Sequence, residues 1–309
     1  GVQRVIDAGP YRSVAARHPQ VPVTHWPGRL IAPGFIDMHV HFPQTDIIGS
    51  PADGLLPWLE NYTFPAEARF DSPAYAAEMA NVFFAELLRH GVTTALTFAT
   101  SHPVSVDAYF EAAQKRGLRM MGGKVLQDRH SPDGLRDETE QSLLDAVYAH
   151  CIHLDEPDRQ LLRDSGAAAA VSPTSNLFLG SGFFDFAGAQ RVGFLHGLAS
   201  DVGGGTSFSP FHTMLAAYFV GREGETKQGL SLQPSHLWWL HTGGAARALG
   251  LEGVIGTLQA GTEADFVLLN PRATPLLARK PERAQNLEEL LFALIVLGDD
   301  RVVEQTVIA

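Results

Sequence analysis

Two patterns of hydrophobic and polar residues alternate along this chain. Short apolar runs, typical of buried strands, are followed by stretches in which apolar residues recur every three or four positions, as on one face of a helix. The apolar runs predict strands over 29–41, 91–98, 118–126, 147–150, 167–172, 197–201 and 301–308, with a hairpin over 256–269. The helical spacing predicts helices over 73–90, 105–117, 136–145, 155–165, 211–221, 234–249 and 286–297. Residues 1–28 show no helical period, and 51–67 are predicted to form a long loop with a helical turn.

Strands that alternate with helices in this way predict an α/β fold in which βαβ units build a parallel sheet. About six of the strands of a TIM-like (β/α)8 barrel can be identified. We expect this barrel to occupy residues 29–252. The strand-rich ends of the chain, 1–28 and 253–309, are expected to pair as a small β domain beside it. Barrels of this type carry their active site at the carboxyl ends of the strands.

Two histidines end the first strong strand, in the run from Pro33 to His41. Side chains two apart on a strand point to the same side, so His39 and His41 can hold one divalent metal ion. In a chain with 13 histidines such a pair also arises by chance, and it would then be a surface or hydrogen-bonded pair. The apolar strand before the pair and the polar run 42–46 after it favour the metal site.

Other polar residues stand at expected strand ends. Asp201 precedes three glycines, where an aspartate commonly caps a helix or a turn. At a strand end that faces a metal it can instead be a ligand and accept a proton, and we favour that role. A lone strand histidine is more often structural, so the pattern alone does not assign His150. Cys151 is predicted to be an inert buried thiol rather than a nucleophile.

Composition and charge narrow the class of protein. Of the 309 residues 45% are hydrophobic and 18% are charged, which is ordinary for a globular protein. The net charge of -11 and the lack of a basic run disfavour nucleic acid or an anionic membrane as a partner. A single cysteine excludes an intrachain disulfide and fits a reducing compartment, so we expect a cytoplasmic location. No apolar run reaches membrane-spanning length.

Longer motifs extend these signals along most of the chain. They lie at residues 33–41, 42–46, 55–65, 123–129, 149–154, 173–177 and 200–207. On these motifs the chain resembles the amidohydrolase superfamily, and within it the guanine deaminases. The first two motifs distinguish guanine deaminases best from related deaminases.

The resemblance implies an amidohydrolase barrel with one Zn²⁺ per chain, held by His39, His41 and Asp201. Gln44 would hydrogen-bond the purine edge and His150 would face the substrate, so Asp201 and His150 would be the catalytic residues. The zinc would lower the pKa of a bound water, Asp201 would help to deprotonate it, and the hydroxide would attack C2 of guanine. Xanthine and ammonia would form. The resemblance also suggests a homodimer.

The chain departs from the family pattern near residue 145. The family places an Arg-Phe pair after its fourth barrel strand and a His-x-x-Glu after its fifth, and we expect neither here. Two βα units are therefore expected to be missing at Asp145 and Ala146, and we predict that these residues are not covalent neighbours in the natural protein. Two alternatives stay open: a deaminase of another purine or a pterin, and an inactive scaffold if the segment is truly absent.

Overall fold

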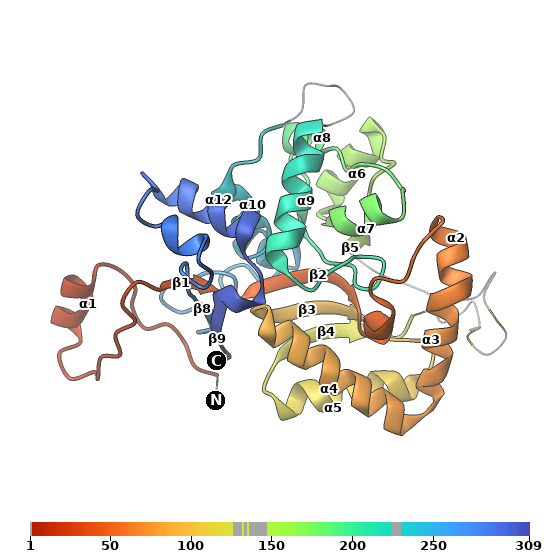
Figure 1. The fold of residues 1–309 in the computed structure, drawn as a ribbon, viewed down its shortest axis with the longest axis horizontal. Helices are drawn as coiled ribbons and strands as arrows, with labels where there is room; N and C mark the ends of the chain where they lie inside the picture. The colour runs from red at the N-terminus through yellow and green to blue at the C-terminus, as the bar shows by residue number, and fades with distance from the viewer. Residues whose placement is uncertain (1, 126–131, 133–134, 136–146, 224–229) are drawn as a thin grey trace.

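The computed structural model describes residues 2–125, 132, 135, 147–223 and 230–309. Parallel strands stand at its centre, helices cover them, and a small antiparallel sheet lies beside them (Figure 1). Both chain ends lie at this small sheet, since Gln3 and Ala309 hydrogen-bond to Ala264 and Asp265. The arrangement is the α/β architecture that the alternation of strands and helices predicts.

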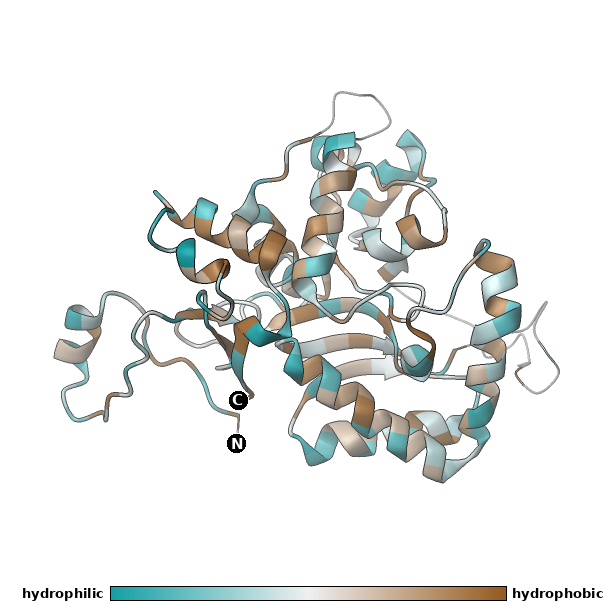
Figure 2. Cartoon of the chain, in the orientation of Figure 1, coloured by the Kyte–Doolittle hydropathy of each residue, from teal (hydrophilic) through white to brown (hydrophobic). Residues whose placement is uncertain are grey.

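The described parallel strands form two sheets, each ordered as in the chain. One contains β2 (Phe35–His41), β3 (Val92–Phe98) and β4 (Arg119–Gly123). The other contains β5 (Val147–Ala149), β6 (Ala168–Val171) and β7 (Leu195–Leu198). The surrounding helices are α4 (Pro73–Arg89), α5 (Pro103–Lys115), α6 (Glu156–Ser165), α7 (Pro173–Phe178), α8 (Phe186–Val192), α9 (Pro210–Glu223) and α12 (Leu287–Leu297). Figure 2 shows hydrophobic residues along β2 and hydrophilic patches on the helices around it.

Two backbone hydrogen bonds join the sheets between β2 and the turn after β7. The N–H of Asp201 donates to the carbonyl of His39, and the N–H of His41 donates to the carbonyl of Val202, each over 2.8 Å. The strands therefore follow one arc in the order β4-β3-β2-β7-β6-β5. Among the described strands, β4 and β5 have no partner on their outer edges. A cavity of about 480 Å³ lies between these edges, lined by residues that include Gly123 and Val147.

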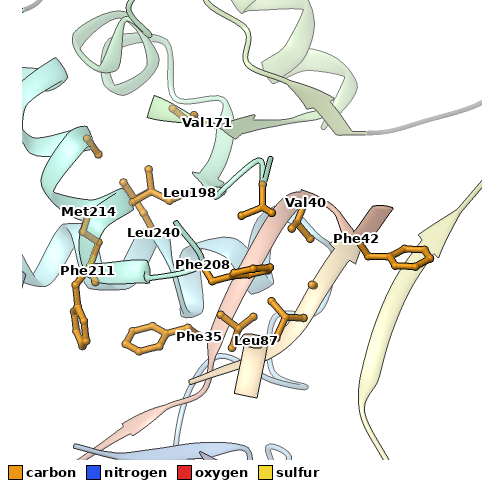
Figure 3. Packing of buried hydrophobic residues seen from close by; sticks show 14 of the residues in the cluster. Phe35, Val40, Phe42, Leu87, Val171, Leu198, Phe208, Phe211, Met214 and Leu240 are labelled. Carbon is orange, nitrogen blue, oxygen red and sulfur yellow. The ribbon is translucent and has the colours of Figure 1, made fainter. Parts of the chain in front are cut away.

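Small side chains fill the inside of the arc. Ala168, Ala170 and Ala199 pack there with Ile36 and Met38. The alternate strand residues face the helices in a larger cluster, in which Figure 3 labels Phe35, Val40, Phe42, Leu87, Val171, Leu198, Phe208, Phe211, Met214 and Leu240. Each strand thus has one face against the helices and one face inside the arc, as a barrel wall requires.

The single strand expected over 29–41 is divided at Gly34. The part before it, β1 (Leu30–Pro33), pairs antiparallel with β8 (Phe266–Leu269), which pairs in turn with β9 (Val303–Val307). A Cβ on Gly34 would lie 2.2 Å from Oγ1 of Thr93, so only glycine allows the chain to pass from the small sheet into β2 at this point.

Several local predictions were wrong. Residues 11–17 form a helix, α1 (Tyr11–Arg17), and the expected loop over 51–67 is largely helical, with α2 (Leu55–Trp58), a π-helical turn η2 (Leu59–Thr63) and α3 (Phe64–Ala68). The helix expected over 234–249 is two helices, α10 (Pro234–Leu240) and α11 (Gly243–Ala248). The first arm of the hairpin over 256–269 consists of turns, and only β8 is a strand. The helix expected over 136–145 and the junction at Asp145 lie outside the described residues.

Candidate metal centre and active site

His39 and His41 stand at the carboxyl end of β2, and a β-bulge lies in the strand between Asp37 and Val40. Asp37 pairs with Ala95 and Val40 with Thr97, so β2 contains one residue more than β3 over this stretch. Bulges re-aim side chains and are common next to active sites. Here the bulge leaves Val40 in the large apolar cluster while both histidines reach the turn that follows β7.

The structure brings His39, His41 and Asp201 together. Nε2 of His39 lies 3.2 Å from Nε2 of His41 and 3.1 Å from Oδ1 of Asp201, and the distance from His41 Nε2 to the same oxygen is 3.4 Å. Ligand atoms at the corners of a tetrahedron, each about 2.0–2.1 Å from a central zinc, would be about 3.3 Å apart. The three donor atoms therefore already have the separation that a shared metal ion requires.

Asp201 is held in an unusual backbone conformation at this site. Its φ is +52°, in the left-handed region that non-glycine residues seldom adopt. The residue is only 6% exposed. Burial alone would raise the pKa of Asp201, but the charges of His39, His41 and His150 and a hydrogen bond from His39 outweigh it and lower the pKa below its ordinary value. Asp201 is therefore anionic at neutral pH.

Burial keeps the imidazole of His41 neutral. Burial, followed by repulsion from His39, lowers the pKa of His41 to about 3. Neutral imidazoles are the form that binds metals. The candidate donor set consists of two imidazole nitrogens and one carboxylate, a combination that suits zinc.

His150 lies next to this cluster, at the residue that follows β5. Its φ is +63°, and its Nε2 is 3.6 Å from Oδ2 of Asp201. The other ring nitrogen, Nδ1, is 2.7 Å from Oδ1 of Asn176 on α7, an atom that can only accept. His150 therefore carries its proton on Nδ1 when neutral, and its Nε2 lone pair faces the site.

Gln44 is buried, and hydrogen bonds to both the nitrogen and the oxygen of its side-chain amide hold it in place. Its Nε2 donates to Oε1 of Glu67 over 3.0 Å, and its Oε1 accepts the N–H of Gly203 over 3.2 Å. A carboxylate can only accept and a backbone N–H can only donate, so the orientation of this amide is unambiguous. Gln44 retains one N–H and one lone pair for a ligand.

A cavity of about 810 Å³ opens over these residues. His41, Gln44, His150 and Asp201 line its polar part, and its apolar wall includes Trp58 from α2. This cavity could hold a small planar molecule against the metal cluster.

Sequence reasoning did not find Glu67 and Asn176. Glu67 lies on a short helix with ordinary spacing, and its contact with Gln44 arises because α3 packs against the 3-10 turn after β2, η1 (Phe42–Ile47), which carries Gln44. Asn176 lies within the motif at 173–177, to which no role was assigned, and α7 brings it to His150.

The expectation that the chain contains no His-x-x-Glu was wrong, because His153 and Glu156 have this spacing. His153 lines the cavity, but Glu156 begins α6 and pairs with Arg191 and Arg159 on the surface. This pair therefore does not add a carboxylate to the metal cluster. Cys151 is partly buried, and burial raises the pKa of its thiol to about 11, so it is a poor nucleophile at neutral pH.

The family model of the amidohydrolase family matches residues 30–147 and 142–309. The two matched segments meet at the predicted junction. Guanine deaminase of Escherichia coli K12 is 34% identical over 369 positions, which cover 93% of this chain and 83% of that protein. The human guanine deaminase is 26% identical and covers 88% of this chain and 80% of that protein. Both alignments are longer than the 309 residues of this chain, so the relatives contain residues that have no counterpart here.

Solved structures give the same result. The guanine deaminase of Bradyrhizobium japonicum superimposes with a TM-score of 0.89 at 27% identity, covering 99% of this chain and 90% of that chain. The E. coli guanine deaminase superimposes with a TM-score of 0.83 at 33% identity, covering 91% of this chain and 82% of that chain. The chain therefore belongs to the amidohydrolase family, and its relatives group it with the guanine deaminases.

Proposed function

We propose that this protein is a zinc-dependent guanine deaminase, which hydrolyses the bond between C2 and the amino group of guanine to give xanthine and ammonia. The convergence of His39, His41 and Asp201 beside a cavity that also contains Gln44 and His150 is the observation that carries the proposal. The similarity to guanine deaminases, such as that of Escherichia coli K12 at 34% identity, supports the choice of substrate.

His39, His41 and Asp201 would hold the zinc ion, since three protein ligands are the usual number at a catalytic zinc. When bound, the ion supplies Lewis acidity and makes water a nucleophile at neutral pH. Family membership supports a metal, and the choice of zinc rests on the nitrogen and oxygen donors and on their separations.

Asp201 would also move a proton. Its Oδ1 faces the two histidine nitrogens, while its Oδ2 is free to accept a proton. His150 Nε2 lies 3.6 Å from that oxygen, so a proton can be held between the two groups and passed to a leaving amine. The hydrogen bond from His150 to Asn176 keeps Nε2 in the accepting state.

Gln44 would recognise the substrate. Its free N–H and lone pair form an adjacent donor and acceptor, which matches the alternating acceptors and donors along a purine edge. Because Glu67 and Gly203 fix the amide, the purine would meet a prearranged pair of groups.

The test is conversion of guanine to xanthine by the purified protein, followed by ultraviolet absorbance. Removal of metal with a chelator should abolish turnover, and added Zn²⁺ should restore it. His41→Ala should be inactive, whereas His18→Ala, a change at a histidine that pairs with Asp7 far from the cavity, should be as active as the wild type. Turnover of another purine or a pterin without turnover of guanine would overturn the substrate assignment. Zinc binding without turnover of any of these compounds would favour the inactive scaffold.

Three further points belong to the proposal. Residues 1–28 and 253–309 would form a small domain, which the pairing of β8 with β9 supports. The protein would be a cytoplasmic homodimer, which light scattering on the purified protein can test. Among the described residues, no helix has the length and apolar character needed to cross a bilayer.

A further inference from the structure

Asp37 is a buried carboxylate that lies on β2 just before the candidate metal ligands. It is 2% exposed and lies on β2, two residues before His39. Its Oδ1 accepts two backbone N–H groups, that of His39 over 3.2 Å and that of Ser200 over 3.0 Å. One oxygen therefore binds a residue of β2 and a residue of the turn after β7.

These two contacts lie at the junction across which the metal ligands are divided. His39 and His41 belong to one sheet, and Asp201 follows a strand of the other. Hydrogen bonds join the two backbones at three places along this junction. They are the bond from Asp201 to His39, the bond from His41 to Val202, and the bond from Ser200 to the carboxylate oxygen of Asp37. The separation of the ligand atoms therefore depends on how these points hold the two backbones.

The bulge in β2 gives the carboxylate of Asp37 a second structural role, as a hydrogen-bond acceptor for a backbone N–H of the bulge. A bulge interrupts the regular pairing of the strand and leaves a backbone group without its usual partner. The N–H of His39 lies within this bulged stretch and donates to Asp37 instead. A carboxylate is an expensive group to bury, and it is tolerated here because it accepts two hydrogen bonds.

We propose that Asp37 is a positioning residue, which fixes the backbone of His39 against that of Ser200 and thereby sets the spacing of the metal ligands. The inference rests on the proposed metal site. It assigns to Asp37 no contact with the metal or the substrate.

The test measures Zn²⁺ affinity by competition with a chromophoric chelator, and the visible spectrum of the Co²⁺-loaded protein. Asp37→Ala removes the acceptor from both N–H groups and should weaken Zn²⁺ binding by about 10–100-fold, the range found when groups that orient metal ligands are removed. It should also shift the Co²⁺ bands. Asp37→Asn retains an oxygen at the same position and should bind Zn²⁺ within about threefold of the wild type.

Asp265→Ala is the matched control, because Asp265 is also buried and accepts a backbone N–H, that of Ala309, but lies beside the small sheet, directly before β8. It should lower the melting temperature and leave Zn²⁺ affinity unchanged. If Asp37→Ala does not fold, Asp37→Ser, which is too short to reach both N–H groups, takes its place with the same expectation.

Wild-type affinity and an unchanged Co²⁺ spectrum in Asp37→Ala would overturn the inference and leave the proposed function intact. An equal loss of affinity in Asp265→Ala would also overturn it, because the effect would then be one of general stability. A wild-type protein that binds no Zn²⁺ would overturn the proposed function, and this inference with it.

Discussion

Gly205→Ala tests how tightly the turn after β7 fixes Asp201. Gly205 closes this turn through a hydrogen bond of 2.5 Å from its N–H to the carbonyl of Asp201. A Cβ added to Gly205 would lie 1.7 Å from the carbonyl oxygen of Ser200 and 3.0 Å from the carbonyl carbon of Asp201. These atoms belong to the backbone, so no side-chain rotation can relieve the clash.

The size of the effect follows from these distances. A carbon and a carbonyl oxygen normally approach to about 3.3 Å, so the backbone of Ser200 or Gly205 must move by roughly 1.5 Å. Metal–ligand distances tolerate about 0.2 Å, and a misplacement of about 1 Å at a catalytic group costs roughly 10²-fold in rate. We expect kcat/KM for guanine to fall by at least about 10²-fold, equivalent to roughly 2.7 kcal/mol of transition-state stabilisation. Overpacking should lower stability by about 1–3 kcal/mol.

The assay compares kcat/KM, zinc content and urea unfolding of Gly205→Ala with those of Gly123→Ala. Gly123 ends β4, and an added Cβ there meets nothing within 4 Å, so the control should match the wild type. Wild-type zinc content and kcat/KM in Gly205→Ala would refute the reasoning, because the turn would then be able to move without disturbing Asp201.

Three other outcomes are expected. His39→Ala should lose most of its zinc, whereas Asp201→Asn should retain more zinc yet lose about 10²–10⁴-fold in kcat, because an amide cannot accept a proton; an active Asp201→Asn would contradict this. Burial lowers the pKa of His241 from 6.5 to about 4. As the pH falls, His241 is therefore protonated in the unfolded chain before it is protonated in the folded protein. The free energy of unfolding should fall by about 3 kcal/mol between pH 6.5 and 4 for this reason. Urea unfolding of the wild type should show this pH dependence of the free energy of unfolding, and His241→Gln should remove it. An equal pH dependence in the wild type and the variant would contradict its attribution to His241. The intact mass of the natural protein should exceed 33.4 kDa, and a peptide that joins Asp145 directly to Ala146 at that mass would refute the missing segment.

Local sequence patterns predicted the elements that are uniform along their length. Strands such as β3 and helices such as α4 carry one apolar pattern from end to end, and the predictions agree with them. The wrong predictions lie where tertiary contacts, rather than the local pattern, determine the secondary structure. The division of the first strand depends on the approach of Gly34 to Thr93, which no local pattern reveals.

The candidate site shows the same limit. The spacing of His39 and His41 indicates a metal pair because both residues lie on one strand. Asp201 could be added only from its place at a strand end and from the family resemblance. Glu67 and Asn176 hydrogen-bond to Gln44 and His150, and each contact joins residues that are distant in sequence, over 23 and 26 residues.

The arc of strands explains why the site is partly complete in this chain. The ligands from β2 and β7 meet because these strands are neighbours, and hydrogen bonds join them without help from any other strand. The opening lies between β4 and β5, the two ends of the arc, whereas the junction of β2 and β7 lies at its middle. The family model is divided between segments that meet at the same place in the sequence as this opening. A barrel of eight strands closes only when every strand has two neighbours. Residues inserted between Asp145 and Ala146 would enter the structure beside β4 and β5. They would then face the cavity over the candidate site from the side opposite Asp201. In this position they could add groups to the site without changing the junction of β2 and β7.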